Sequence, residues 1–161
     1  FISQEITASY GGSIEVESKP SKGTSFIVRL PMYKAKILVM DDEEMIRKLA
    51  GELLSYLGYE VEFALDGTEA IKRYKQALDS KKPFDAVILD LTVKGGMGGK
   101  ETIEKLVKID PQVVAILSSG YCNDPGITDF GRYGFRGVVT KPYTMSELGE
   151  RLNQVVASGQ N

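Results

Sequence analysis

Residues that could take part in chemistry stand where short apolar, strand-like runs of the chain end. Acidic residues follow two of these runs, and hydroxyl or lysine side chains follow two others. They are Asp41, Asp42, Glu43 and Glu44 after the first run, Asp90 after the third, Ser118 and Ser119 after the fourth, and Thr140, Lys141 and Pro142 after the fifth. Ligands of open parallel sheets bind outside the carboxyl ends of the strands, so these residues are the first candidates for a site.

A cluster of three carboxylates is expected within this set. In the strand order 2-1-3-4-5 the first and third strands are neighbours, which brings Asp41, Asp42 and Asp90 close together. Crowded carboxylates have raised pKa values unless a cation neutralises them, and an all-oxygen cluster suits Mg²⁺ or Mn²⁺. Lys141 would bring a positive charge opposite Asp90. A divalent ion, a lysine and a hydroxyl around one carboxylate are what an aspartate needs to attack phosphorus.

Helix capping is the alternative explanation for Asp41 and Asp42, because acidic residues at a helix start interact favourably with the helix dipole. The presence of Asp90 and Lys141 at matching strand ends disfavours that alternative. The two serines carry meaning only as members of this set, since a pair of serines alone is typical of a solvated turn.

The elements that must position these residues alternate between strands and helices from residue 35 onward. Helical spacing recurs between the runs, from Met45 to Leu57 in steps of four and from Ile103 through Leu106 to Val107. Capping boxes are expected at Asp66 with Glu69 and at Thr144 with Glu147. The strand-like runs are 35–40, 59–64, 84–89, 113–117 and 137–140. This pattern predicts an α/β fold, a doubly wound five-stranded parallel sheet of flavodoxin-like order 2-1-3-4-5.

The first residues predict a separate, smaller part: a helix over 2–9, then strands over 13–18 and 25–30 joined by a turn at 20–23. We therefore expect a small N-terminal helix-hairpin appendage over 1–33 and the main domain over 34–161. A helix and hairpin of this size cannot bury enough apolar surface to be stable alone. We expect it to dock on the larger part, to pair with another copy, or to be partly disordered.

Composition excludes several classes of function. The chain has 161 residues and a formal net charge of -2, from 20 Lys+Arg and 22 Asp+Glu, so it has no basic field to hold nucleic acid. It has no histidine, which excludes histidine bases, histidine metal sites and Ser-His-Asp triads. The single cysteine, Cys122, and the absence of a membrane-length apolar run indicate a cytoplasmic protein without membrane contact. The start at Phe1, without a leader, suggests a piece of a longer protein.

Four separated motifs resemble the receiver domain of two-component response regulators. They are ILVMDDEE at 37–44, AVILD at 86–90, ILSSGY at 116–121 and VVTKPY at 138–143. The resemblance implies that Asp90 is the phosphoacceptor and that Lys141 pairs with the phosphoryl group. It further implies Mg²⁺ binding by Asp41 and Asp42, with Asp42 the more direct ligand and the Thr92 carbonyl completing the set.

The resemblance also implies a switch hydroxyl, and Ser119 fits because it stands 22 residues before Lys141, the usual interval in receivers. Other positions depart from the pattern. Lys94 replaces a common proline and opens a loop with four glycines by Gly99, which we expect to be mobile. Val138 stands where receivers often carry a switch aromatic, and Tyr143 could serve a contact role instead. The peptide bond between Lys141 and proline is cis in many receivers.

The segment SYGGSIEVESKPSKGTSFIVRLP at 9–31 resembles the end of the ATP-binding domain of sensor histidine kinases. The nucleotide motifs and the phosphohistidine domain of that family are absent from the chain, so no ATP site can form here. Together the two resemblances suggest the C-terminal end of a hybrid sensor histidine kinase, cut within its kinase core.

The leading hypothesis is a receiver that accepts a phosphoryl group from a phosphohistidine onto Asp90 and then switches its protein contacts. Its partner would be a histidine kinase or a histidine phosphotransfer domain, and a homodimer is a further arrangement to test. A pseudo-receiver binding module and a haloacid-dehalogenase-type phosphatase are the alternatives. The phosphatase is disfavoured because Thr92 stands where that family has a second aspartate. An FMN-binding domain is disfavoured because Asp41 to Glu44 would repel a phosphate.

Overall fold

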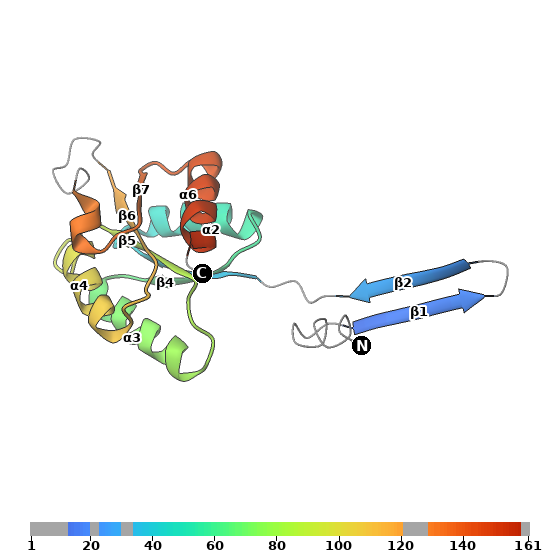
Figure 1. The fold of residues 1–161 in the computed structure, drawn as a ribbon. Coiled ribbons are helices and arrows are strands. Elements are labelled where there is room, and N and C mark those ends of the chain that lie inside the picture. The colour runs from blue at the N-terminus through green and yellow to red at the C-terminus, as the bar shows by residue number, and fades with distance from the viewer. Residues whose placement is uncertain (1–12, 20–22, 30–33, 121–128, 159–161) are drawn as a thin grey trace. The chain divides into compact units, whose positions relative to one another are not determined.

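The structure is a computed structural model that describes residues 13–19, 23–29, 34–120 and 129–158. The chain divides into two compact units, Phe1–Tyr33 and Lys34–Asn161 (Figure 1). The helix expected over 2–9 and the tip of the turn expected at 20–22 lie outside the described residues.

The larger unit is an α/β fold around a five-stranded parallel sheet of order β4-β3-β5-β6-β7. Numbered within this unit, the order is 2-1-3-4-5, which confirms the predicted doubly wound, flavodoxin-like topology. The strands are β3 (Lys36–Met40), β4 (Glu60–Ala64), β5 (Ala86–Asp90), β6 (Ala115–Ser119) and β7 (Gly137–Thr140). The helices are α2 (Glu44–Tyr56), α3 (Gly67–Asp79), α4 (Gly99–Ile109) and α6 (Met145–Ser158), with a short 3₁₀ helix η1 (Phe130–Tyr133). None of the helices in the described part of the chain has the length and apolar character needed to cross a membrane.

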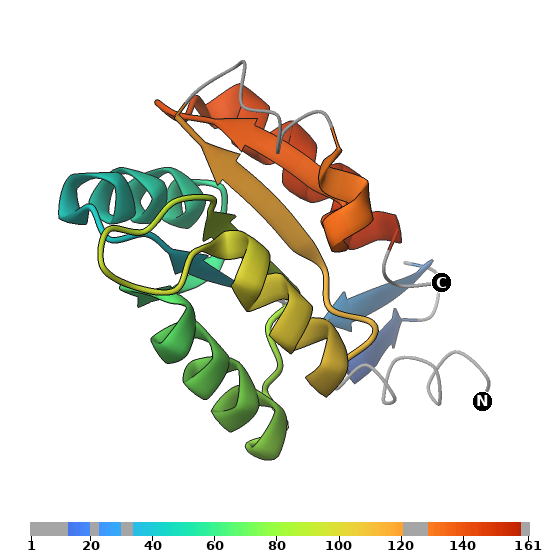
Figure 2. The ribbon, with the colours of Figure 1, turned by 90° about the vertical axis from the view of Figure 1, so that its left-hand side faces the viewer.

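Helices cover both faces of this sheet, α2 and α6 on one side and α3 and α4 on the other (Figure 2). Successive side chains of β3 therefore enter two different cores. Ile37 and Val39 pack on the α2 and α6 side, whereas Leu38 and Met40 pack on the α3 and α4 side. Because successive strand residues point to opposite faces, a central parallel strand must be apolar throughout, as the sequence of β3 is.

Helix α2 forms where expected, but it buries a different face from the predicted one. The pattern from Met45 to Leu57 placed Met45 against the core, and this prediction was wrong, since Met45 is 84% exposed. Ala50 and Leu54 are the fully buried positions. The reason is that the side of the helix with small residues packs on the sheet. At Gly51, a Cβ would lie 2.6 Å from a phenylalanine ring of the sheet. The helix approaches the sheet along its smallest residues, which an apolar count does not reveal.

Helix α4 agrees with its predicted face only in part. Ile103 and Leu106 are fully buried, but Val107 is 36% exposed. Thr102 is also buried, and its hydroxyl donates a hydrogen bond to the Gly98 carbonyl at 2.7 Å. A threonine whose hydroxyl is satisfied within its own helix can enter a core, which a strictly apolar pattern does not anticipate.

Two strands run to later residues than the apolar runs suggested. β5 ends at Asp90 and β6 ends at Ser119, so both polar residues lie on the strands themselves. The register pairs Asp90 with Ser118, and the amide of Leu91 donates to the Ser118 carbonyl at 2.9 Å. Backbone pairing thus continues past the last apolar residue, so the hydrogen bonds of the sheet hold the backbone that carries these polar side chains.

In the smaller unit, β1 (Ser13–Lys19) pairs antiparallel with β2 (Gly23–Arg29). The pairing Val16 with Phe26 places these side chains on one face, with Val28 beside them. All three are more than half exposed, at 53%, 70% and 55%. The predicted hairpin is therefore present, and its apolar face is exposed among the described residues.

Candidate functional site

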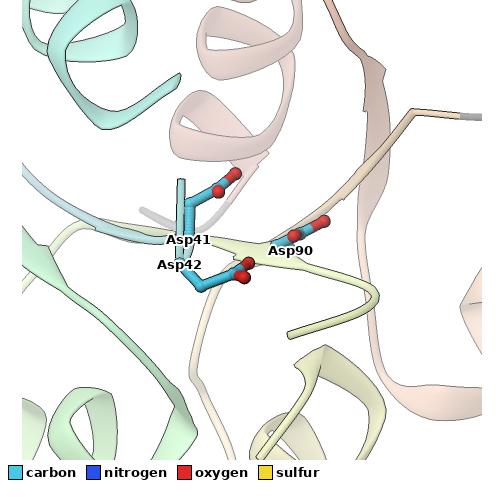
Figure 3. A group of neighbouring side chains, drawn as sticks. All are labelled: Asp41, Asp42 and Asp90. Carbon is cyan, nitrogen blue, oxygen red and sulfur yellow. The ribbon is translucent and has the colours of Figure 1, made fainter. Parts of the chain in front are cut away.

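Three carboxylates gather at the carboxyl end of the larger sheet (Figure 3). Asp41 and Asp42 directly follow β3, and Asp90 ends the neighbouring β5, so the parallel register brings them to one edge. One carboxylate oxygen from each residue lies within 4.8 Å of the others. Asp41 is fully buried, Asp90 is buried, and Asp42 is half-buried. The strand-end rule therefore located the three acids from the sequence.

Lys141 enters this cluster from the turn that follows β7. Its Nζ lies 3.0 Å from Asp90 Oδ2 and 2.6 Å from Asp41 Oδ2. The sequence placed the lysine opposite Asp90, but the shorter contact to Asp41 was not foreseen. One ammonium group is thus shared by two buried carboxylates. The peptide bond from Lys141 to Pro142 is cis, as the resemblance implied.

The electrostatics of the site follow from this sharing. Burial raises the pKa of Asp90 to about 6, even though the charge and hydrogen bond of Lys141 and the amide of Thr92 act in the opposite direction. The charge of Asp41 adds to the increase. Burial works against a charged Lys141, but its contacts with Asp41 and Asp90 outweigh that effect, so the pKa of Lys141 lies above its usual value. The lysine therefore stays charged while Asp90 titrates.

The donor set fits a hard divalent cation. Three carboxylates and one ammonium leave two net negative charges on a cluster of oxygen ligands, which is the pattern that Mg²⁺ prefers. Asp41 is already engaged, because its Oδ1 accepts the amide of Glu43 at 2.9 Å and its Oδ2 contacts Lys141. Asp42 Oδ2 accepts one long hydrogen bond, from the amide of Lys94, at 3.4 Å. Among the three acids, Asp42 has the least engaged oxygens in the described part of the chain.

A hollow of about 600 Å³ opens beside these groups. Asp42, Asp90 and Lys141 line it together with Thr92 and Ser119. Asp41 is absent from its lining, since this carboxylate is buried behind Lys141. The sequence-predicted site residues other than Asp41 therefore line one open hollow.

The two serines of β6 have different surroundings. Ser119 is 2% exposed and lines the hollow, where the sequence interval placed the switch hydroxyl. Ser118 is fully buried, and its hydroxyl shares a hydrogen bond of 2.7 Å with the hydroxyl of Tyr143. Tyr143 is only 6% exposed, and the contact role suggested for it stays a prediction. Burial raises the pKa of Tyr143, which keeps this hydroxyl protonated.

The glycine-rich loop after β5 packs closely against the strand end. A Cβ at Gly98 would lie 2.6 Å from the Leu91 carbonyl oxygen, and one at Gly99 would lie 2.7 Å from the Asp90 carbonyl oxygen. Gly95 adopts a left-handed φ of 71°. The glycines therefore let the start of α4 approach the strand that carries Asp90, and the mobility expected for this loop stays a prediction.

Glu147, which the sequence marked only as part of a capping box, also supports the site. Thr144 does cap α6, since its hydroxyl accepts the amide of Glu147 at 3.2 Å. The Glu147 carboxylate, however, turns to Thr140, accepting its amide and its hydroxyl, each at 3.0 Å. This pair bridges the turn that carries Lys141. The capping-box spacing marked Glu147, but its partner depends on the tertiary fold. The other predicted box agrees more closely, because Asp66 accepts the amide of Glu69.

Comparison with known proteins agrees with this arrangement. Residues 37–153 match the model of the response regulator receiver domain family. The chemotaxis protein CheY of Thermotoga maritima is 31% identical over 121 residues, which is 74% of this chain and 96% of that protein. A crystal structure of a receiver domain protein from Clostridium thermocellum matches with a TM-score of 0.69 and 27% identity, covering 77% of this chain and 95% of the other.

Other relatives are much longer than the matched region. The transcription factor SKN7 of Chaetomium thermophilum is 27% identical over 124 residues, which are 77% of this chain but only 16% of that protein. The family match, residues 37–153, lies within the larger unit and includes Asp41, Asp42 and Asp90. The chain therefore belongs to the response regulator receiver domain family, whose members accept phosphoryl groups in two-component signal transduction.

Proposed function

We propose that Asp90 accepts a phosphoryl group from a phosphohistidine of another protein or domain. The observation that carries this proposal is the shared ammonium group, since Lys141 Nζ lies 3.0 Å from Asp90 and 2.6 Å from Asp41 beside an open hollow. In the transfer, an Asp90 oxygen forms a bond to phosphorus while the phosphorus–nitrogen bond breaks. The bonding electron pair leaves with the imidazole nitrogen.

The chain's own residues prepare this step. With a pKa of about 6, Asp90 is largely ionised near neutral pH and has a lone pair to donate. Lys141 remains charged and lies where it can neutralise an oxygen of the incoming phosphoryl group. Ser119 lines the same hollow and would donate its hydroxyl to a second oxygen. Positioning and charge neutralisation are the main contributions that proteins make to phosphoryl transfer.

A divalent cation completes the proposal. Asp42, with its weakly engaged oxygens, would be a direct ligand of Mg²⁺ or Mn²⁺, together with Asp90 and the carbonyl of Thr92. Asp41, whose Oδ1 accepts the Glu43 amide and whose Oδ2 pairs with Lys141, would act more through its charge than as a close ligand. When bound, the cation would neutralise charge on the transferring oxygens. Loss of the cation should therefore stop transfer without unfolding the sheet.

Phosphorylation would then change protein contacts through the end of β6. An acylphosphate on Asp90 attracts the hydroxyl of Ser119, which lies on the adjacent strand. A shift of this hydroxyl would favour one of two conformations of the receiver, so the modification would bias an existing equilibrium. A histidine kinase or a histidine phosphotransfer domain is the proposed partner, and self-association into a homodimer is a second proposed readout.

For the smaller unit, we propose that residues 1–33 are the C-terminal remnant of a histidine kinase ATP-binding domain and that 34–161 form the receiver. Support comes from the order of elements, since a GG pair precedes β1 and a GT pair opens β2, as in the resemblance at the sequence level. The parent would be a hybrid kinase with this part in the cytoplasm. A structure of the intact parent kinase would test this proposal, and we expect it to contain the same hairpin with its apolar face covered.

The test is the intact mass of the full chain after incubation with acetyl phosphate and Mg²⁺. We expect one added phosphoryl group, lost in Asp90→Asn and in the presence of EDTA. Asp129→Asn is the matched control, because Asp129 makes an exposed ion pair with Arg132 away from the acidic cluster. No adduct with several small donors, despite Mg²⁺ binding, would indicate a pseudo-receiver. Continuous release of phosphate with rapid turnover would indicate the phosphatase alternative.

A further inference from the structure

The hydroxyl pair of Ser118 and Tyr143 lies next to the site but outside the proposed chemistry. The two oxygens are 2.7 Å apart, and the residues are 0% and 6% exposed. A buried hydroxyl that loses its partner leaves an unsatisfied polar group, which is costly in a core. The pair therefore holds together two segments that are 25 residues apart in the chain.

This hydrogen bond connects the strand beside Asp90 to the turn of Lys141. Ser118 is paired in register with Asp90, and its carbonyl accepts the amide of Leu91 at 2.9 Å. Tyr143 follows Lys141 and Pro142 directly. The bond thus spans from the phosphoacceptor's neighbour to the segment that presents the lysine.

In the described part of the chain, two further hydrogen bonds hold the turn near its ends. At the strand end, the amide of Lys141 donates to the Ser119 carbonyl at 2.9 Å. From the helix end, Glu147 accepts the amide of Thr140 at 3.0 Å. Tyr143 lies between these points and packs into the core on the α2 and α6 side. Its hydroxyl is the contact that ties the middle of the turn to β6.

The lysine has little tolerance for displacement, because its Nζ must reach Asp41 at 2.6 Å and Asp90 at 3.0 Å simultaneously. We propose that Tyr143 is a positioning residue, which through its hydrogen bond to Ser118 holds the turn so that Lys141 bridges both carboxylates. This inference rests on the proposed function only in its effect on phosphoryl transfer, since the positioning itself is a property of the unphosphorylated protein.

A matched control exists within the same chain. Tyr74 is also buried, at 2% exposed, and its hydroxyl donates to Asp110 Oδ2 at 2.7 Å, in a contact that includes none of the site residues. Tyr74→Phe therefore removes an equivalent buried hydroxyl without touching the Lys141 turn. A role of Tyr143 in stability alone predicts the same behaviour for both variants.

The experiment compares Tyr143→Phe, Ser118→Ala, their double variant and Tyr74→Phe in the full chain. The rate of Asp90 labelling by acetyl phosphate is measured at saturating Mg²⁺, and Mg²⁺ affinity is measured by calorimetry. We expect labelling to slow about tenfold in Tyr143→Phe and in Ser118→Ala, with Mg²⁺ affinity within about twofold of wild type. Tyr74→Phe should label at the wild-type rate although its midpoint temperature also falls.

The double variant separates positioning from stability. Removing both hydroxyls leaves no orphaned group, so its midpoint temperature should rise above that of Ser118→Ala. Its labelling should nevertheless remain about tenfold slow, because the connection to the turn is still missing. Recovery of the labelling rate along with the midpoint temperature would overturn the inference.

Backbone amide exchange at Lys141 provides a readout that needs no phosphorylation. Its N–H donates to the Ser119 carbonyl, so a loosened turn should exchange this proton faster in Tyr143→Phe than in Tyr74→Phe. If wild type is not labelled but exchange at Lys141 still accelerates, the proposed function fails and the positioning role stands. If exchange and labelling both match those of Tyr74→Phe, the positioning role is wrong.

Discussion

Strands β5 and β2 both contain a run of consecutive apolar residues, but their surroundings in the structure differ. All five residues of β5 are buried, whereas all seven residues of β2 are exposed. β5 has a parallel neighbour on each side and helices over both faces, while β2 has one antiparallel partner among the described residues. An apolar run therefore favours a strand, and the surrounding chain decides whether the faces of that strand are buried.

The same contrast extends to the acidic side chains. Burial raises the pKa of Asp90 on β5, whereas the hydrogen bond and charge of Arg29 lower the pKa of Glu15 on β1. Glu15 stands in water, and its ion pair with Arg29 is exposed. The pKa of a carboxylate is raised in this way only where the sheet edge removes the group from solvent. This is why the larger unit has a reactive site and the hairpin has none among its described residues.

The largest expected effect tests the buried strand. Ile88 lies fully buried in the middle of β5, in the core shared with α2 and α6. Ile88→Ala should lower the free energy of unfolding of the larger unit by about 4 kcal/mol, because it removes buried methyl groups and leaves a cavity. Urea denaturation followed by circular dichroism measures this change. A loss below about 1 kcal/mol would mean that β5 is not the packed centre of the fold.

Removing the ammonium group that Asp41 and Asp90 share should have the second-largest effect. Lys141→Met leaves Asp41 and Asp90 buried without their common partner, so we expect a loss of about 3 kcal/mol near pH 7 in EDTA. The loss should shrink toward pH 5, where Asp90 is protonated and needs no counter-charge. Lys105→Met is the control, since Lys105 pairs with Glu101 on the exposed side of α4. Equal losses in both variants would contradict a buried role for Lys141.

The titration of Asp90 itself gives the third prediction. Its pKa is raised from 3.8 to about 6 in the folded chain, so folding favours the protonated form. The associated stability is present below about pH 4 and is lost as the pH rises through 6, a change of about 2 to 3 kcal/mol. Asp90→Asn should remove this dependence and be the more stable protein at pH 8 in EDTA.

Denaturation of Asp90→Asn and wild type at pH 4.5 and pH 8 checks that sign. Added Mg²⁺ should then stabilise wild type at pH 8 much more than the variant. The cation offsets the charge of the Asp90 carboxylate, which the variant lacks. Glu15→Gln on the hairpin is the comparison, and it should change neither the pH dependence nor the response to Mg²⁺. An Asp90→Asn protein less stable than wild type at pH 8 would show that burial does not disfavour the charge.

The sequence predicted the acidic site because its members stand at strand ends, and the strand-end rule needs no side-chain detail. Asp41, Asp90 and Lys141 converge through backbone register alone. The Ser118 to Tyr143 bond was out of reach, because it depends on which way a buried ring points. The buried face of α2 was missed for a related reason, since close approach at Gly51 depends on the absence of a side chain. Patterns of apolar residues record hydrophobicity, whereas these features depend on shape.

A smaller effect is expected where a helix supports the site from outside. Glu147→Gln keeps the shape of the side chain but replaces charged acceptors for the Thr140 amide and hydroxyl with one neutral oxygen. The free energy of unfolding should fall by about 1 kcal/mol, because a half-buried hydrogen bond to a charged group becomes neutral. Denaturation at pH 7 measures it, with Glu150→Gln as the exposed control on the same helix. A loss in Glu150→Gln as large as in Glu147→Gln would remove the special role of the Thr140 contact.

The smallest effect should come from the hairpin, where the apolar side chain is largest. Phe26 is 70% exposed on β2, so truncating it removes little buried surface and leaves no cavity. Phe26→Ala should therefore change the free energy of unfolding of the larger unit by less than about 0.5 kcal/mol. Urea denaturation followed by far-ultraviolet circular dichroism measures this change. In the described chain all helices belong to the larger unit, so their signal reports its unfolding. A loss above about 2 kcal/mol would show that this face is covered by the receiver, and β2 would then resemble β5 more than its exposure indicates.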